Sequence, residues 1–244
     1  PDYPTNFQEK KWGKLSTGNH RGFTKYSQFY PRRSLIIISA FRDRIFKISD
    51  PSMRSFLLFV LTAASYGLTV FNRFLPERNS NVGMLANTLF IPPLYCETNA
   101  IEKIREKFKD IINVQRRLPD ANGIISTQSA TDLSNIPDNS IDYAYIDPPF
   151  GDNILYVSSN SVSESWLKVF SNGNTEAIIS EWRKKTPEVY KQLLSGAFRE
   201  LFRVLKPGRW ITVEFHNSKA LIWNYLQESI LRAGFVIAQV TVMD

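Results

Sequence analysis

The chain has 244 residues, 43% of them hydrophobic, which suits one large domain or one domain with an appendage. Its single cysteine, Cys96, excludes an internal disulfide and a cysteine zinc site, and two histidines are too few for a histidine-rich metal centre. We therefore expect no metal, and a reducing, cytoplasmic compartment. The formal net charge of +7 favours an anionic partner such as nucleic acid.

Helical patterns dominate the first third of the chain. Pro31 opens one helix with apolar residues at three- and four-residue spacing, and a second helix is predicted over residues 53–66. The uncharged run over residues 55–71 is shorter than the roughly 20 apolar residues of a membrane span, so we expect a buried helix and no membrane partner. The sequence thus predicts a mainly helical N-terminal region over residues 1–86, ending in a polar loop over 72–86.

The remaining residues, 87–244, change from a further amphipathic helix to an alternation of strands and helices. Apolar runs separated by amphipathic stretches imply βαβ units and a mainly parallel sheet, which is an α/β fold. The predicted strands lie at residues 123–128, 141–146, 210–215 and 235–242, and the predicted helices between them lie at residues 190–205 and 219–233.

One predicted strand ends in an unusual way, in the run IDYAYIDPPFGDN over residues 141–153. The two prolines after Asp147 fix the backbone near φ −65° and carry no amide hydrogen, so the strand exit is stiff and rich in hydrogen-bond acceptors. Phe150 places an aromatic ring beside these oxygens. Ligands of open α/β sheets bind beyond the carboxyl ends of the strands. Acceptors next to a stacking plane suit a flat heterocycle with an amino group, such as adenine or cytosine turned out of a duplex.

The strand and its exit resemble the amino-group DNA methyltransferases, which carry Asp/Asn/Ser-Pro-Pro-aromatic at this position. Similarity extends over DLSNIPDNSIDYAYIDPPF and LFRVLKPGRWITVEFHNS, and GDNILYVSSNSVSESWLK resembles a loop of the large adenine-specific methylases that often carry a zinc ribbon. The resemblance covers residues 22–244 and is most specific over 122–244. It implies an enzyme that uses S-adenosylmethionine and has a Rossmann-like fold, which is incomplete in this chain. Residues 1–86 would form a helical region and residues 87–244 the catalytic domain.

The resemblance also implies a role for each residue of the strand exit. Asp147 and the Pro148 carbonyl would accept hydrogen bonds from the exocyclic amine of adenine in DNA, Pro149 would stiffen the backbone, and Phe150 would stack on the base. The amine would then take the methyl group of S-adenosylmethionine. Three residues that follow would shape the loop over the base, namely Asp152, Asn153 and Tyr156.

The chain departs from the family at the cofactor side, because the glycine-rich turn Phe/Pro-x-Gly-x-Gly is absent. Gln128 and Ser129 stand where relatives often place Gly-Asp. We expect these two residues, together with Thr131 or Asp132, to supply substitute polar contacts to the cofactor. We further expect the glycine-rich segment to lie upstream, on the remainder of a longer restriction-modification or phage-defence methylase. A fragment without that segment would be inactive alone.

Two other functions remain compatible with these residues. The chain could be a non-catalytic nucleic-acid-binding subunit of a modification complex that keeps the fold and relies on a partner for the cofactor. It could also methylate RNA or a protein side-chain amide, since both reactions use an Asn/Asp-Pro-Pro-aromatic site. The positive net charge favours nucleic acid over protein as the substrate.

Overall fold

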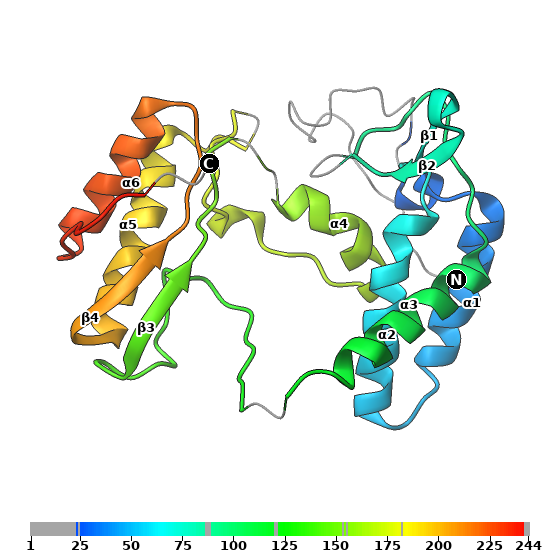
Figure 1. Ribbon diagram of the computed structural model, residues 1–244, viewed down its shortest axis with the longest axis horizontal. Coiled ribbons are helices and arrows are strands. Elements are labelled where there is room, and N and C mark those ends of the chain that lie inside the picture. The colour runs from blue at the N-terminus through cyan, green and yellow to red at the C-terminus, as the bar shows by residue number, and fades with distance from the viewer. Residues whose placement is uncertain are drawn as a thin grey trace. The chain divides into compact units, whose positions relative to one another are not determined.

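The structure is a computed structural model that describes residues 23, 25–85, 89–119, 122–152, 154, 156–181 and 183–241. The chain divides into two compact units (Figure 1). Unit 1 comprises residues 1–123 and 155–172, and unit 2 comprises residues 124–154 and 173–244. Unit 1 therefore receives a segment from the second half of the sequence, in addition to the helical region expected over residues 1–86.

Unit 1 is mainly helical and also contains a short antiparallel hairpin. Its second helix begins where the Asp50 carboxylate accepts hydrogen bonds from the amides of Ser52 and Met53, which is the usual capping arrangement. Asn99 caps the third helix in the same way. The elements are η3 Tyr26–Phe29, α1 Arg32–Ile45, α2 Pro51–Ser65, η4 Tyr66–Leu68, β1 Arg73–Leu75, η5 Pro76–Arg78, β2 Ser80–Gly83, α3 Ala100–Gln115 and α4 Tyr156–Leu167.

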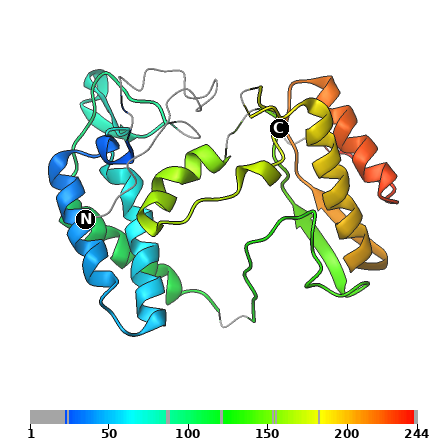
Figure 2. The ribbon, with the colours of Figure 1, turned by 180° about the vertical axis from the view of Figure 1, so that it is seen from behind.

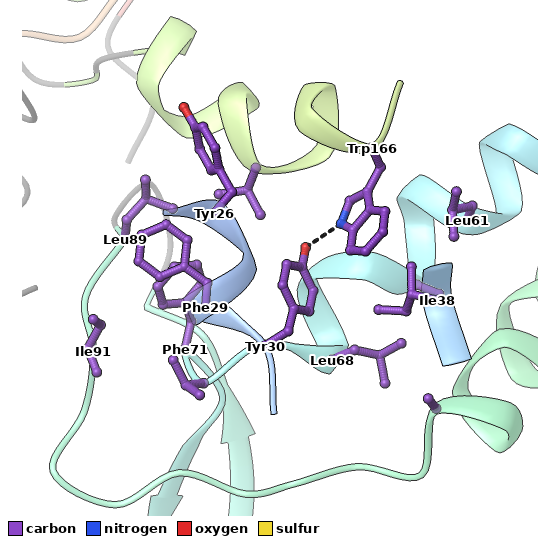
Figure 3. Packing of buried hydrophobic residues seen from close by; sticks show 14 of the residues in the cluster. Tyr26, Phe29, Tyr30, Ile38, Leu61, Leu68, Phe71, Leu89, Ile91 and Trp166 are labelled. Atoms are coloured by element: carbon purple, nitrogen blue, oxygen red, sulfur yellow. Dashed lines mark hydrogen bonds between the residues drawn. The ribbon is translucent and has the colours of Figure 1, made fainter. Parts of the chain in front are cut away.

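An aromatic core holds unit 1 together (Figure 3). Phe29 is fully buried, and its ring centroid lies 4.9 Å from that of Phe71. The indole Nε1 of Trp166 donates a 2.8 Å hydrogen bond to the Tyr30 hydroxyl, and the two rings meet edge to face. Complete burial is the main reason that the pKa of Tyr30 is raised above its ordinary range. Trp166 thus attaches α4 to the first elements of the chain.

Unit 2 consists of a two-stranded parallel sheet packed on two helices that lie side by side (Figure 2). Tyr190, Phe198 and Leu226 are buried between the helices, and Ile146 and Val213 pack onto them from the sheet. The sheet, η6 and the helices have the bounds β3 Ile141–Ile146, η6 Gly173–Thr175, α5 Pro187–Val204, β4 Leu205–Val213 and α6 Ala220–Arg232. Unit 2 is thus a mixed α/β unit, which confirms the fold class at that level.

The predicted parallel sheet is observed in part. Of the four predicted strands, those at 141–146 and 210–215 form β3 and β4, whereas the described residues of 123–128 and 235–242 form no strand. A strand needs a neighbour for its backbone amides and carbonyls. Ile124 and Ile125 are 99% and 100% exposed, so no ladder or helix covers them. A mainly parallel, Rossmann-like sheet is therefore not observed in the part of the chain that the structure describes.

Three smaller predictions were wrong. Residues 72–86 contain the hairpin β1–β2 in place of a loop, and the residues after Phe150 contain α4. Residues 206–209, expected to connect the predicted helix at 190–205 to the predicted strand at 210–215, lie inside β4, where the register shifts between Ile141 and Tyr143 and Gly208 adopts φ +73°. This irregularity in the ladder accommodates the extra residues of β4 without ending the strand.

The segment before β3 is fastened to the C-terminal half of α5. The Arg203 guanidinium donates to the carbonyls of Leu133 and Ile136 at 2.8 and 3.0 Å, and it also pairs with Glu200 and Asp138. The Glu200 carboxylate accepts from the Leu133 amide at 2.8 Å. The Arg203 hydrogen bonds, followed by the Leu133 amide, lower the pKa of Glu200 to about 2.

This lowered pKa predicts a specific loss of stability in acid. Because the pKa of Glu200 is lower in the folded chain than its ordinary value of 4.5, its contribution is complete above about pH 4.5 and is lost as the pH falls towards 2. The free energy of unfolding of unit 2 should differ between wild type and Glu200→Gln at neutral pH, and the difference should shrink below about pH 4.5. Urea titrations across this range measure it, and Glu102→Gln on the surface of α3 is the control. A difference that stays constant with pH would contradict the assignment.

Candidate substrate-binding corner

Residues 147–151, which we call the corner, leave the sheet at the carboxyl end of β3. The ladder ends at Ile146, whose partner is Val213 and whose carbonyl accepts from the Glu214 amide at 2.9 Å. Asp147 is the first residue beyond it and is exposed. The two prolines that follow are half-buried.

The hydrogen-bond acceptors of residues 147–150 fall into two groups. The later pair is occupied: the Tyr190 hydroxyl donates to the Pro149 carbonyl at 2.6 Å, and the Asn217 side-chain amide donates to the Phe150 carbonyl at 2.8 Å. The earlier acceptors are the Asp147 carboxylate and the carbonyls of Asp147 and Pro148. Within the described residues, no hydrogen bond or ion pair engages any of them. Hydrogen bonds therefore fix the corner at Pro149 and Phe150. The acceptors of Asp147 and Pro148 have no partner within the described residues.

Gly151 closes the corner and tolerates no larger residue without adjustment. Its φ of +74° lies in the left-handed region, which residues with a Cβ rarely adopt. A Cβ built there would lie 3.3 Å from Nδ2 of Asn217 and 3.6 Å from Ile222. Its carbonyl also accepts from the Ile179 amide at 3.1 Å. Backbone conformation and close packing therefore both require glycine at this position.

The Phe150 ring belongs to a short series of perpendicular aromatic contacts. Its centroid lies 5.4 Å from that of Phe215 at 89°, and Phe215 lies 5.1 Å from Trp223 at 86°. The Trp223 indole nitrogen donates to the Asn217 carbonyl at 2.8 Å, which ties the series to the same asparagine that holds the corner. Edge-to-face contacts of this kind fix ring orientation. Phe150 itself is half-buried.

The rim of the sheet around Asp147 carries negative charge. The Tyr145 hydroxyl donates to the Glu214 carboxylate, which comes directly after β4. This hydrogen bond is the main reason that the pKa of Tyr145 is raised, and the charge of Asp147 adds a smaller contribution. Two carboxylates thus lie at the carboxyl ends of the two strands, where they favour a ligand that is a hydrogen-bond donor or gains positive charge.

The three residues expected to shape the loop over the base have different positions. Asp152 follows the corner and pairs with the Lys219 ammonium at 2.7 Å, and both side chains are exposed to solvent. Asn153 lies outside the described residues. Tyr156 begins α4 and belongs to unit 1. A direct role for these residues stays a prediction.

Two of the three residues expected to contact the cofactor, Ser129 and Asp132, lie in a turn on the middle of α5. The Ser129 hydroxyl is 2.8 Å from that of Thr131, and the Asp132 carboxylate accepts from the Ser134 amide at 3.1 Å. Gln128 is exposed. The Thr131 methyl group would lie 3.2 Å from a Cβ at Gly196, so this turn rests on the helix. A cofactor bound by Ser129 or Asp132 would contact side-chain oxygens that already form these local hydrogen bonds.

The basic cluster at residues 183–185 differs from an open nucleic-acid surface. The Arg183 side chain is 14% exposed and pairs with Glu176. The Lys185 ammonium donates to the carbonyls of Asn174 and Glu176, and burial lowers its pKa. Two of the three cations therefore stabilise the loop before α5. Within the described residues, no acid, histidine or cysteine cluster could hold a metal ion, and no helix is long and apolar enough to cross a membrane.

Sequence reasoning missed the residues that hold the corner. Tyr190 is fully buried and Asn217 is 6% exposed, and they lie 41 and 67 residues after the carbonyls they bind. A signal existed for Asn217, because it follows the strand next to β3, and the carboxyl ends of neighbouring parallel strands meet at one edge. Tyr190 lies in the apolar stripe of α5, where its hydroxyl gives no periodic signal.

Comparison with protein-family models, with curated proteins and with solved structures finds no match for this chain. The function proposed below is supported by the contacts of the corner and by the resemblance of its sequence.

Proposed function

We propose that this chain carries the base-binding side of a methyltransferase that acts on the exocyclic amine of adenine in DNA. The observation that supports it most is the division of acceptors at the corner. The Asp147 carboxylate and the Pro148 carbonyl are open at the rim of a parallel sheet, while the next two carbonyls are fixed by Tyr190 and Asn217. An amine has two hydrogens, and these two oxygens are neighbours that could accept one each.

The chemistry required of these oxygens is modest. As an amine attacks a methyl group its nitrogen becomes positively charged, and acceptors held in place stabilise that charge with little reorganisation. Asp147 supplies a full negative charge, and Glu214 on the adjacent strand end adds to the same field. A strong general base is unnecessary, because the amine loses its proton after the nitrogen has become cationic.

The rigidity of the corner contributes through alignment. Both proline φ angles are fixed by their rings, and the two anchored carbonyls restrict the backbone on the far side. Holding the reactants in a reactive orientation removes part of the entropic cost of a bimolecular step. The Phe150 ring would stack on the base and set the plane of its amine.

The proposal assigns the methyl donor to residues outside the corner. S-adenosylmethionine, when bound, supplies a methyl group already activated by its sulfonium. Ser129 and Asp132 are engaged in a local turn, and Arg203 and Glu200 fasten this segment to α5. We therefore place the donor on a glycine-rich segment of the complete protein, which would also complete a Rossmann-like sheet beside β3 and β4.

The complete native protein should transfer tritiated methyl groups from S-adenosylmethionine to unmethylated duplex DNA, with the label recovered in N6-methyladenine. Parallel reactions with RNA and with protein substrates identify the substrate class. Label in RNA or in a protein amide alone would replace DNA as the substrate. DNA binding without transfer to any of the three would favour the non-catalytic subunit.

A further inference from the structure

The corner is held by hydrogen bonds from two side chains that do not reach the open acceptors themselves. Tyr190 comes from the first turns of α5, and Asn217 comes from the segment between β4 and α6. Each binds the carbonyl of one corner residue, Pro149 or Phe150, at 2.6 and 2.8 Å. Two elements that follow β3 in sequence thus fix adjacent peptide groups directly behind Asp147 and Pro148.

Hydrogen bonds at both side-chain polar atoms of Asn217 determine its orientation. Its Oδ1 accepts from the Lys219 amide at 2.8 Å, its Nδ2 donates to Phe150, and its carbonyl accepts from the Trp223 indole. At 6% exposure, its amide would carry an unsatisfied polar group if the corner moved away. The same cost applies to Tyr190, whose ring is fully buried against α6. Movement of the corner would therefore leave two buried polar groups without a hydrogen bond, one on Asn217 and one on Tyr190.

We propose that Tyr190 and Asn217 are positioning residues that hold the Asp147 carboxylate and the Pro148 carbonyl in the orientation required by the substrate amine. This inference rests on the proposed function, and it adds that the catalytic geometry is set by α5 and by the segment after β4. The prolines alone cannot set it, because proline fixes φ and leaves ψ free. The ψ angles of Pro148 and Pro149 decide where the open oxygens point, and the bonds to the Pro149 and Phe150 carbonyls restrict them.

Tyr190→Phe tests the inference with the smallest change, because it removes one hydroxyl and leaves the ring in the core. The matched control is Tyr143→Phe, which removes a hydroxyl that donates to Thr212 at 2.6 Å on the exposed face of the same sheet. Two backbone amides report on the corner without any substrate, since Ile179 donates to Gly151 and Glu214 donates to Ile146. In Tyr190→Phe their hydrogen exchange should accelerate about five- to tenfold, whereas the control should leave Ile179 unchanged.

The kinetic readout separates positioning from general destabilisation. With the complete protein, kcat for methyl transfer to DNA should fall about tenfold in Tyr190→Phe while KM for DNA stays within about twofold, and the control should match wild type. Asn217→Asp keeps the side-chain acceptor and removes the donor. It should also lower kcat, by a larger factor, while KM for DNA stays within about twofold. Asn224→Asp on the exposed face of α6 is its control.

The possible failures are distinguishable. Wild-type protein that transfers no methyl group to DNA would overturn the proposed function, and this inference with it. Wild-type transfer together with an unchanged kcat in Tyr190→Phe would overturn the positioning role alone. If Asn217→Asp fails to fold, Tyr190→Phe still decides the outcome, because its exchange rates and its kcat are measured on a folded protein.

Discussion

Replacing Asp147 with alanine is expected to lower methyl transfer by about 10²- to 10³-fold, the range found when one preorganised polar group is removed from a site of developing charge. Asp147 is exposed and takes no part in the ladder or in any ion pair within the described residues, so the fold should remain intact. The free energy of unfolding should therefore change by less than about 0.5 kcal/mol. Steady-state transfer assays and urea titrations on the same preparations measure the two quantities.

The chain offers a matched control for this substitution in the same strand. Asp142 lies near the other end of β3 and pairs with Lys206 and Arg209 at 2.8 and 3.1 Å. Asp142→Ala removes an exposed carboxylate of the same size and charge but should leave transfer unchanged. Asp147→Asn, which keeps one acceptor oxygen, should retain more activity than Asp147→Ala. Equal activity of Asp147→Ala and wild type would remove Asp147 from the site.

The sequence predicted the position of the corner correctly because local chemistry determines it. The alternation in IDYAYI gives β3, and two prolines cannot continue a ladder, so the strand ends before Asp147. The end of α6 was predicted for the same reason. Gly234, at φ +107°, donates to the Leu231 carbonyl, and Phe235 donates to that of Ile230, which is a Schellman motif.

Helix α4 could not be predicted from its sequence, because tertiary contacts determine it. The run YVSSNSVSESWL is rich in serine and has weak amphipathic character. Val162 and Trp166 are four residues apart and almost completely buried, and the small Ser165 beside them satisfies its hydroxyl on the Val162 carbonyl at 2.6 Å. Local preferences of serine for turns are thus overridden by the packing of one tryptophan.

The strands predicted over 123–128 and 235–242 show the opposite case, in which local preference is strong and tertiary support is missing. Ile124 and Val236 belong to apolar runs that favour strands, and they are 99% and 85% exposed. A strand is stable only beside another strand. The apolar pattern predicted a strand at both places, but it could not predict whether a neighbouring strand would be present to pair with it.

Phe29 is the residue whose loss should destabilise unit 1 most. It is completely buried and contacts three other rings, with centroid distances of 5.9 Å to Phe23, 6.2 Å to Tyr26 and 4.9 Å to Phe71. Its backbone carbonyl also accepts a hydrogen bond from the Val70 amide at 2.8 Å. Both the ring and the backbone of Phe29 therefore connect η3 to the segment after α2. Phe29→Ala should lower the free energy of unfolding of unit 1 by about 3–5 kcal/mol, because it removes the contacts and leaves a cavity.

The comparison that isolates this effect is Phe59→Ala, since Phe59 is 60% exposed on α2 and should change stability by less than about 0.5 kcal/mol. Hydrogen exchange is the suitable measurement, because a chain with two compact units need not unfold in a single transition. Amides of α1 and α2 should exchange at least about a hundredfold faster in Phe29→Ala, while those of α5 and α6 should keep their wild-type rates. Equal acceleration in both units would show that they unfold together, and an effect no larger than that of Phe59→Ala would show that the aromatic core is not what stabilises unit 1.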